Sequence, residues 1–464
     1  MNNFFHVIKD PVHGTMQFTS TEDAWVKPFI DSGNFQRLRH IKQLGMGDFI
    51  FPGAVHTRFN HCLGCSYVAS QIAHKVGLAD EERQLVMIAS LLHDVGHGPF
   101  SHAFEGIFYD KLIQHEDWTP HFLRDYNTND FFQHYNRINP RHHLTEDKFR
   151  VIAEMIMHKP VTKSVLADIV SSQLDSDRLD YLLRDSHFCG VKYGEFDFHW
   201  MLHCMTIVES KEGERLGITD KGIGAIEHYL MARRLMTRNI YHSRKKLALE
   251  TLLVYLLSNL ASHLEYHQAY GDIRHTRLGK FLIAANRFNQ QIEQSNDKSV
   301  LKQAFLDEQY KTYKELCDYD VFSLIKQLTE VNDATAACEI AKRLHERRMP
   351  KIVRLNYADL PSIEMEIQTF KSKHQALFQD WQILLIQTPH RSYSGEEDPI
   401  LVLNEQGEVH TISDFSFTIN ALTDRLEHIL FLAVDDSICD HALVNALMKK
   451  LQMNERELMI GENK

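Results

Sequence analysis

Histidine and aspartate side chains crowd into one short segment of this sequence, where together they could bind a metal ion. The segment reads Leu91-Leu92-His93-Asp94-Val95-Gly96-His97-Gly98-Pro99-Phe100-Ser101-His102. Apolar residues at helical spacing precede it, so His93 and Asp94 are predicted to end a buried helix that the following glycines terminate. A buried imidazole and carboxylate require polar partners. One divalent metal would satisfy both groups, and a structural His–Asp hydrogen bond would do so as well.

Two further segments contribute residues of the same types. The chain has 29 histidines among 464 residues, so an isolated histidine says little and the clusters must carry the interpretation. His61 begins a predicted helix, with Arg58 three residues before it. Downstream, Asp177, Tyr181 and Asp185 are four residues apart, so a helix would place them on one face. Beside a metal this face would bind an oxygen-rich ligand, although a salt-bridged surface face shows the same pattern.

The elements that position these residues are predicted to be mainly helical. Apolar residues recur at spacings of three and four in residues 24–30, 35–44, 63–76, 82–93, 147–158, 166–184, 223–244 and 248–264. Residues 4–17 are expected to be extended. A short β-hairpin is predicted from Met205 to Thr219, around the turn Ser210-Lys211-Glu212-Gly213.

The pattern changes after about residue 350. Residues 382–387, 400–404, 409–412 and 429–434 are predicted to be strands, and residues 419–426 a helix. We therefore expect a helical body over residues 1–350, with the histidine- and aspartate-bearing core at about 35–200, and a small α+β module over residues 351–464.

Charge and composition exclude several classes of function. The formal net charge is −11, which disfavours binding to duplex DNA or an anionic membrane, because both depend on clustered Lys and Arg. A small polyanion needs only a local basic pocket. No signal peptide or membrane-length apolar run is visible, and the seven scattered cysteines indicate a cytoplasmic protein. Cys62 and Cys65 are interpreted as buried core thiols.

The pattern of His61, the His93-Asp94 doublet and Asp177 is the one that names the HD phosphohydrolases. The surrounding strings are similar to those of a narrower branch, the deoxynucleoside triphosphate (dNTP) triphosphohydrolases. These strings are Asp10-Pro11-Val12-His13-Gly14, Phe35-Gln36-Arg37-Leu38-Arg39, Lys42-Gln43-Leu44-Gly45, Phe51-Pro52-Gly53-Ala54 and Asp180-Tyr181-Leu182-Leu183-Arg184-Asp185. The resemblance covers roughly residues 5 to 250 and implies a mainly α fold with an HD-domain helical core.

The resemblance implies a metal site and a group of catalytic residues. Its metal ligands would be His61, His93, Asp94 and Asp177, a mixed N/O set suited to Mn, Fe, Co, Ni or Zn, with Mg accompanying the nucleotide. The catalytic residues would be His102 and His115, together with Glu105, which stands where the family has an aspartate, and His97, which would face the phosphate nearest the sugar.

The same resemblance implies how a dNTP would be bound. Arg58, Arg178 and Arg233 would contact phosphates, and Arg178 replaces a lysine of the family, which keeps the charge but changes the hydrogen-bond geometry. The sugar would be held by Gln43, Leu44, Tyr181, Asp185 and Tyr241. Among these, Gln43 and Asp185 would bind the 3′-hydroxyl, while Leu44 and Tyr241 would pack where a 2′-hydroxyl would lie.

Regulation and assembly follow by the same analogy. An activating GTP or dNTP would bind between subunits through Asp31, Gln36 and Arg39. At this site His6 and Thr219 depart from the family pattern, whereas Lys221 fits it. The expected assembly is a homo-oligomer, a tetramer built from dimers.

The predicted activity is hydrolysis of a dNTP to deoxynucleoside and triphosphate. The alternatives are another HD phosphohydrolase, such as a nucleotidase or phosphodiesterase, and a nucleotide sensor without turnover. A nucleic-acid-binding protein is the third alternative.

Overall fold

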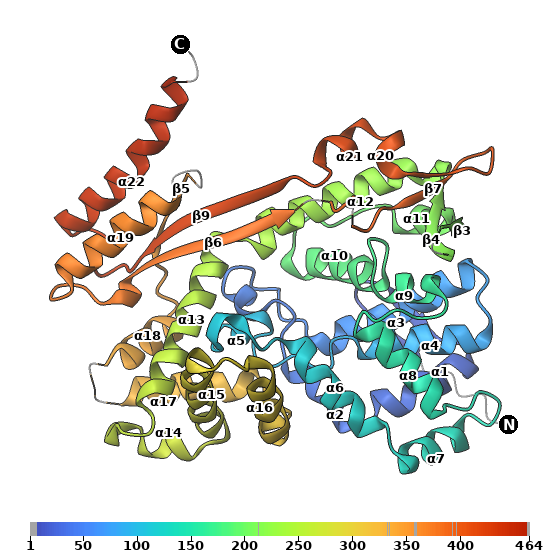
Figure 1. Cartoon of the computed structure of the whole chain (residues 1–464), viewed down its shortest axis with the longest axis horizontal. Coiled ribbons are helices and arrows are strands. Elements are labelled where there is room, and N and C mark those ends of the chain that lie inside the picture. The colour runs from blue at the N-terminus through green and yellow to red at the C-terminus, as the bar shows by residue number, and fades with distance from the viewer. Residues whose placement is uncertain are drawn as a thin grey trace.

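The computed structural model describes residues 7–211, 213–331, 333, 335–356, 360–391, 393–395 and 397–461. It is mainly helical with small sheets, as the sequence predicts (Figure 1). The expected extended start is an antiparallel hairpin of β1 (Val7–Asp10) and β2 (Gly14–Gln17). Phe4, Phe5 and His6 lie outside the described residues.

Three helices carry the histidine and aspartate motifs. They are α3 (Arg58–Lys75), α4 (Asp80–Leu92) and α10 (Ser176–Cys189), and α3 packs against both of the others. A buried core of aliphatic and aromatic side chains surrounds them. Burial of this kind is the main source of stability for such helices.

Other helices complete the body (Figure 1). In the first half they are α1 (Ser20–Ile30), α2 (Gly33–Gln36), η1 (Arg37–His40), η2 (Gly45–Phe49), α5 (His102–Glu105), η3 (Tyr109–Lys111), α6 (His115–Tyr126), α7 (Asn129–Ile138), α8 (Glu146–Ile156), α9 (Ser164–Val170) and α11 (Phe198–Cys204). In the second half they are η4 (Asp220–Gly222), α12 (Ile223–Met236), η5 (Thr237–Tyr241), α13 (Arg244–His263), η6 (Gln268–Tyr270), α14 (Gly271–His275), α15 (Arg277–Gln294), α16 (Lys298–Tyr313), α17 (Asp318–Glu330) and α18 (Ala336–His345). Helices α13 and α15 to α18 enclose a second apolar core.

Three of the predicted helices are interrupted. The stretch 35–44 is wrong as one helix, because α2 passes into the 3₁₀ turn η1 and Lys42 then forms a β-bridge with Thr57. The stretch 166–184 breaks between α9 and α10, where Asp175 caps α10 by accepting the backbone N–H of Arg178 over 2.7 Å. The stretch 223–244 ends in η5, a π-helical turn that closes at Tyr241.

The predicted hairpin of residues 205–219 is confirmed. Strands β3 (Met205–Ser210) and β4 (Gly213–Thr219) are antiparallel; Glu212 of the predicted turn lies outside the described residues. Two strands from the C-terminal region extend this sheet, since β7 (Leu401–Leu403) pairs in parallel with β4 and β8 (Val409–Thr411) pairs with β7.

The remaining C-terminal strands form a separate sheet. Its order is β5 (Lys351–Leu355), β9 (Leu426–Val434) and β6 (Ile383–Arg391), and it packs with α19 (Leu360–His374) and α22 (Ala442–Gly461) in a third core. In Figure 1, β6 and β9 cross the molecule toward α20 (Ile412–Phe415) and α21 (Phe417–Leu422), while α22 projects at the opposite end. The helix expected over 419–426 is shorter, because Leu426 already begins β9.

Residues 351–464 thus contribute both to a core of their own and to the core of the body, where Val402 and Ile412 are buried. The domain boundary at residue 350 stays a prediction. Among the described residues, no single helix is long and apolar enough to cross a membrane, and one bent pair, α13 with residues 268–275, passes that test only by length and composition.

We predict that Gly64→Ala destabilises the protein by about 3 kcal/mol, because overpacking at a closed interface forces side chains or backbone to move. A Cβ at Gly64 would lie 1.8 Å from Asp180 Oδ1 and 2.4 Å from an Arg184 guanidinium nitrogen. Urea unfolding measures the loss. Gly224→Ala in α12, where a Cβ meets nothing within 4 Å, is the control and should be neutral or mildly stabilising. Equal stability of both variants would contradict this account of the contact between α3 and α10.

Candidate active site

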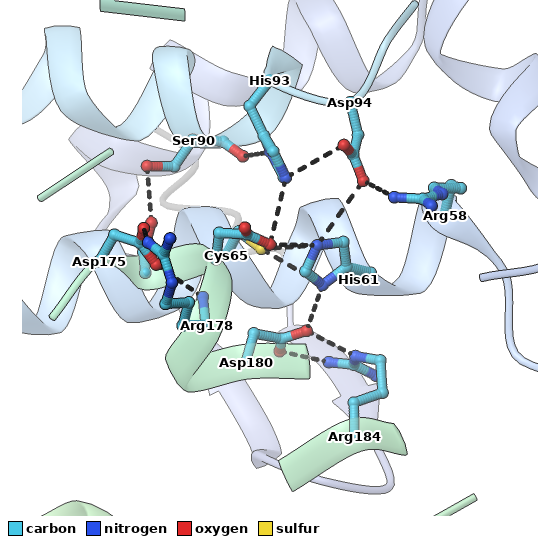
Figure 2. Close-up of polar contacts among 12 residues, drawn as sticks. Arg58, His61, Cys65, Ser90, His93, Asp94, Asp175, Arg178, Asp180 and Arg184 are labelled. Atoms are coloured by element: carbon cyan, nitrogen blue, oxygen red, sulfur yellow. Dashed lines mark hydrogen bonds and ion pairs between the residues drawn. The ribbon is translucent and has the colours of Figure 1, made fainter. Parts of the chain in front are cut away.

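The four side chains predicted to be metal ligands meet where α3, α4 and α10 come together. Figure 2 labels three of them, His61, His93 and Asp94. His61 lies in the first turn of α3, and its Nε2 atom is 2.9 Å from Asp177 Oδ1 and 3.7 Å from Asp94 Oδ2. His93 follows the last residue of α4, and its Nε2 atom is 3.5 Å from both Asp94 Oδ1 and Asp177 Oδ1. Two imidazoles and two carboxylates therefore face one small volume.

A buried carboxylate behind His61 fixes the orientation of its ring (Figure 2). Asp180 Oδ2 lies 2.8 Å from His61 Nδ1, and Asp180 Oδ1 lies 2.7 Å from His13 Nε2. Arg184 donates to both oxygens of Asp180 and to Asp10. An acceptor on Nδ1 places the proton there and leaves the Nε2 lone pair for a metal. In the sequence these residues stand out only as parts of matching strings, and nothing in their spacing signals this network.

The charges of the cluster favour a cation. Burial opposes the charged form of His61, but its hydrogen bonds with Asp177 and Asp180 raise its pKa to about 10. The carboxylates thus favour positive charge at this ring, which a metal at Nε2 would supply in place of the proton. Burial also opposes ionisation of Asp177, yet His61 and His93 hold the pKa of this carboxyl far below its ordinary value. The Nε2 atom of His93 is buried and makes no hydrogen bond within the described residues. These features fit a divalent ion, and the N/O donor set suits a transition metal.

A thiol lies beside the same cluster. Cys65 Sγ is 3.4 Å from each ring nitrogen of His61 and is close enough to His93 and Asp177 to share an ion by distance alone. Burial raises the pKa of this thiol well above its ordinary value, which disfavours the thiolate, and the thiol packs against the imidazole. Cys62 is buried as well, so both thiols of the CxxC pair are buried as predicted.

The residues predicted to be catalytic form a second cluster next to the first. The rings of His97 and His115 stack with centroids 3.6 Å apart, and His102 lies edge-on to them at 5.0 and 5.1 Å. Glu105 Oε1 is 2.8 Å from His115 Nδ1 and 3.3 Å from His102 Nδ1. Burial opposes ionisation of Glu105, but the two histidines lower its pKa. One glutamate therefore orients both rings.

The loop that joins α4 to α5 has an unusual backbone next to these histidines. Phe100 and Ser101 have φ angles of 55° and 54°, in the left-handed region that non-glycine residues rarely adopt. Asp318 at the start of α17 accepts the backbone N–H of Phe100 over 2.7 Å and that of Lys42 over 2.9 Å. A carboxylate more than two hundred positions away thus holds both this turn and the segment before Gln43.

Two further side chains clamp the carbonyl groups of the same loop. The Tyr313 hydroxyl donates to the Gly96 carbonyl over 2.9 Å, and the Arg37 guanidinium donates to the carbonyl of His97. Arg37 also donates to the carbonyl of Lys314 over 2.9 Å. Sequence reasoning missed these anchors, because their partners are backbone atoms in another part of the chain.

The three arginines expected to contact phosphate differ in position. Arg58 and Arg178 line the cavity described below, whereas Arg233 is not among its lining residues. Each arginine is held by a neighbour: Asp94 for Arg58, Asp175 for Arg178 and Gln173 for Arg233. The role of Arg233 stays a prediction.

The residues expected to bind the sugar lie together at the side of α10 that faces η5. The Tyr241 hydroxyl donates to Asp185 Oδ2 over 2.9 Å, and Tyr181 packs against the Tyr241 ring with centroids 5.8 Å apart. Burial and the Asp185 carboxylate raise the pKa of Tyr241 well above its ordinary value, so its hydroxyl stays a donor. Gln43 Oε1 is buried without a hydrogen-bond partner among the described residues, and Leu44 beside it is buried.

One cavity of about 720 Å³ connects these groups. This volume lies in the range of about 300–1,000 Å³ that small-molecule sites occupy. Of the residues predicted from the sequence, its walls include Gln43, Leu44, Arg58, His93, Asp94, His97, His102, His115, Asp177, Arg178, Tyr181, Asp185 and Tyr241. His61 and Glu105 are not wall residues and act on the cavity through their neighbours.

The segment predicted to bind an activator lies elsewhere, at α1, α2 and η1. Arg39 Nε donates to Gln36 Oε1 over 2.7 Å, and the guanidinium lies over the ring of Phe59. Asp31 is exposed and pairs with Lys27 over 2.6 Å. None of Asp31, Gln36 and Arg39 lines the cavity, and the activator site stays a prediction. His6 lies outside the described residues.

Comparison with known proteins agrees with this geometry. Residues 58–182, which contain all four clustered side chains, match the model of the HD domain. The uncharacterised protein YwfO of Bacillus subtilis is 30% identical over 449 residues, which cover 94% of this chain and 93% of that protein. The chain belongs to the HD-domain phosphohydrolases. As an HD-domain protein it has the helical core that its sequence predicts and a group of histidine and aspartate side chains that could bind a metal.

Two further similarities extend the comparison. The human deoxynucleoside triphosphate triphosphohydrolase SAMHD1 is 30% identical over 276 residues, which cover 53% of this chain and 43% of that protein. A crystal structure of a phosphohydrolase from Bacteroides thetaiotaomicron superposes with a TM-score of 0.71 at 24% identity, over 93% of this chain and all of that one (100%). The second similarity concerns the fold alone.

We predict that Asp180→Asn weakens metal binding about 10- to 100-fold, as loss of a carboxylate behind a metal-bound histidine generally does. An amide at this position no longer guarantees an acceptor for His61 Nδ1, so the tautomer that exposes the Nε2 lone pair is less favoured. Equilibrium dialysis against Mn²⁺ measures the affinity. Asp307→Asn is the control. Asp307 pairs with His121 at a distance of 3.0 Å, and neither residue belongs to the cluster. Unchanged affinity in Asp180→Asn would contradict the orienting role.

We predict that Asp318→Asn costs about 1–3 kcal/mol of stability and lowers the rate of hydrolysis about tenfold, since small misplacements of catalytic groups have effects of this size. Asparagine has one acceptor oxygen, so its amide group would oppose the N–H of either Phe100 or Lys42. The matched control is Asp320→Asn, which removes an acceptor for the backbone N–H of Cys317 in the same first turn of α17. Thermal unfolding and turnover are compared, and equal rates in the two variants would contradict the clamp.

Proposed function

We propose that this HD-domain protein hydrolyses a dNTP to a deoxynucleoside and triphosphate. The observation that carries the proposal is that one cavity contains two features of different kinds. A phosphate-compatible end holds the histidine–aspartate cluster with Arg58 and Arg178, and a sugar-compatible side holds Gln43, Tyr181, Asp185 and Tyr241. A general phosphohydrolase needs only the first of these features.

The phosphate end of the cavity has the groups that a triphosphate requires. Bound at His61, His93, Asp94 and Asp177, a divalent transition metal would act as a Lewis acid on a phosphoryl oxygen and activate a water. Arg58 and Arg178 supply donors for charge that develops on the phosphoryl oxygens. His97 would contact the phosphate nearest the sugar; burial and the nearby Arg58 lower its pKa, so it would do so as a neutral ring.

The departing 5′-oxygen needs a proton. His102 and His115 line the cavity, and each has its Nδ1 atom directed at Glu105, so each presents its Nε2 atom away from that carboxylate. The ring of His102 is the more exposed, at 67% of its side chain compared with 13% for His115. An imidazole held by a carboxylate is a suitable general acid near neutral pH.

The sugar side would select a deoxyribose. The Asp185 carboxylate, fixed by Tyr241, would accept the one hydrogen bond that a 3′-hydroxyl can donate. The amide of Gln43, whose Oε1 atom has no partner among the described residues, would donate an N–H to the oxygen of the same hydroxyl. The Tyr241 ring and Leu44 would occupy the space of a 2′-hydroxyl. A substrate without a 3′-hydroxyl would leave the buried polar groups of Gln43 and Asp185 unpaired. Because that is costly, the site would discriminate against such a substrate.

The similarity to SAMHD1 supports the same conclusion, because that enzyme is named as a deoxynucleoside triphosphate triphosphohydrolase. Activation by GTP or a dNTP through Asp31, Gln36 and Arg39, assembly into a homo-tetramer and Mg bound with the nucleotide form part of the proposal by the same analogy.

The test is to incubate the metal-loaded protein with each dNTP and each NTP, singly and in mixtures, and to separate products by ion-exchange chromatography. We expect deoxynucleoside and triphosphate, absent when His93→Ala and Asp94→Ala are combined, and no turnover of NTPs. Turnover only in mixtures would indicate the activator site. Inorganic phosphate or pyrophosphate as the sole inorganic product would overturn the proposal in favour of another phosphohydrolase, and tight binding without turnover would favour a sensor.

A further inference from the structure

A histidine outside the metal cluster connects the two residues expected to hold the 3′-hydroxyl. The backbone carbonyl of His56 accepts the N–H of Gln43 over 3.0 Å, and its Nε2 atom lies 2.7 Å from Asp185 Oδ1. His56 is only 2% exposed, so water does not compete for either hydrogen bond. A single residue thus contacts both sides of the proposed sugar site.

The ring of His56 is fixed by its surroundings. It stacks on Phe188 near the end of α10, with centroids 4.6 Å apart and the planes at 21°. The turn before it approaches α10 closely at Gly53, where a Cβ would lie 2.3 Å from the Phe188 carbonyl oxygen. The Nδ1 atom of His56 is buried and has no hydrogen-bond partner among the described residues. The Nε2 atom therefore carries the hydrogen, and it donates a hydrogen bond to the Asp185 carboxylate.

Asp185 is consequently held from two sides. His56 donates to its Oδ1 atom and Tyr241 donates to its Oδ2 atom, at 2.7 and 2.9 Å. A carboxylate with a fixed donor on each oxygen cannot rotate freely, and each oxygen still has a lone pair for a further donor. Asp185 lines the cavity and His56 does not, so His56 can reach a substrate only through its neighbours.

We propose that His56 is a positioning residue for 3′-hydroxyl recognition, which sets the Asp185 carboxylate and the Gln43 backbone in one geometry. This inference rests on the proposed function, since it concerns the sugar of the same substrate. Its consequence is specific: His56 determines how strongly the enzyme prefers a substrate with a 3′-hydroxyl to its 3′-deoxy analogue.

The experiment compares kcat/KM for a dNTP and for the matching 2′,3′-dideoxynucleotide, using the metal-loaded protein. In His56→Asn the side-chain amide is too short to reach Asp185, so the hydrogen bond between Asp185 and the 3′-hydroxyl is misaligned. We expect the preference for the 3′-hydroxyl, measured as the ratio of the two kcat/KM values, to fall about tenfold or more. In His56→Gln the amide nitrogen can take the place of Nε2, and we expect most of the preference to remain. His74→Asn is the control, as it removes a His–carboxylate bond of 2.6 Å to buried Glu22 outside the cavity.

The outcomes separate this inference from the proposed function. Equal losses on both substrates in His56→Asn, or loss of the preference in a folded His56→Gln, would mean that His56 is merely structural and would overturn the inference. A wild-type protein that hydrolyses both nucleotides equally well would overturn it too, while leaving the proposed activity intact. If the wild-type protein hydrolyses no dNTP, the proposed function fails and the inference fails with it.

Discussion

The candidate active site depends on a single buried carboxylate. Asp180 has no exposed side-chain surface, and an ionised group at such depth is tolerated only when charged and polar partners surround it. His61, His13 and Arg184 are those partners. Burial opposes ionisation of Asp180, but Arg184 and the two histidines hold its pKa well below the ordinary value. The carboxylate therefore remains an acceptor and keeps one tautomer of His61 in place.

This constraint extends into the fold on both sides. Residue 64 must be glycine for α3 to approach the carboxylate on α10, because a side chain there would overlap Asp180 and Arg184. The β1–β2 hairpin is held at the other side, since Asp10 pairs with Arg184 and His13 with Asp180. A hairpin and two helices are thus locked together by charge. The histidine that faces the metal site is positioned by all three.

Apolar periodicity placed His93 and Asp94 at the end of a helix, and the resemblance to the HD family added His61 and Asp177 to the predicted cluster. The network behind it could not be predicted, since His13 and Asp180 are 167 positions apart and their pairing depends on tertiary packing. The prediction of one helix over 35–44 was wrong for a similar reason, because long-range contacts determine the backbone there. There the chain turns so that Arg37 can reach the carbonyl of His97 and the Lys42 N–H can reach Asp318. Long-range hydrogen bonds of this kind override local propensity, and they hold His97 and Gln43 in place.

The HD match ends at residue 182, yet the loop that carries the second histidine cluster is anchored beyond it, by Tyr313 and Asp318. Helices α16 and α17 therefore support the candidate active site structurally, although they contribute no wall to the cavity.

The charge balance of the cavity then bears on how a polyanion could enter it. Arg58 is paired with Asp94 and Arg178 with Asp175, so neither arginine adds an uncompensated positive charge. In a protein of net charge −11, these pairs alone give a triphosphate little electrostatic attraction. A divalent ion bound by Asp94 and Asp177 would neutralise these carboxylates. The positive charge of Arg58 would then no longer be compensated by Asp94. On the proposed function, phosphate binding is therefore coupled to metal occupancy through Asp94, which belongs to both the metal site and the arginine pair.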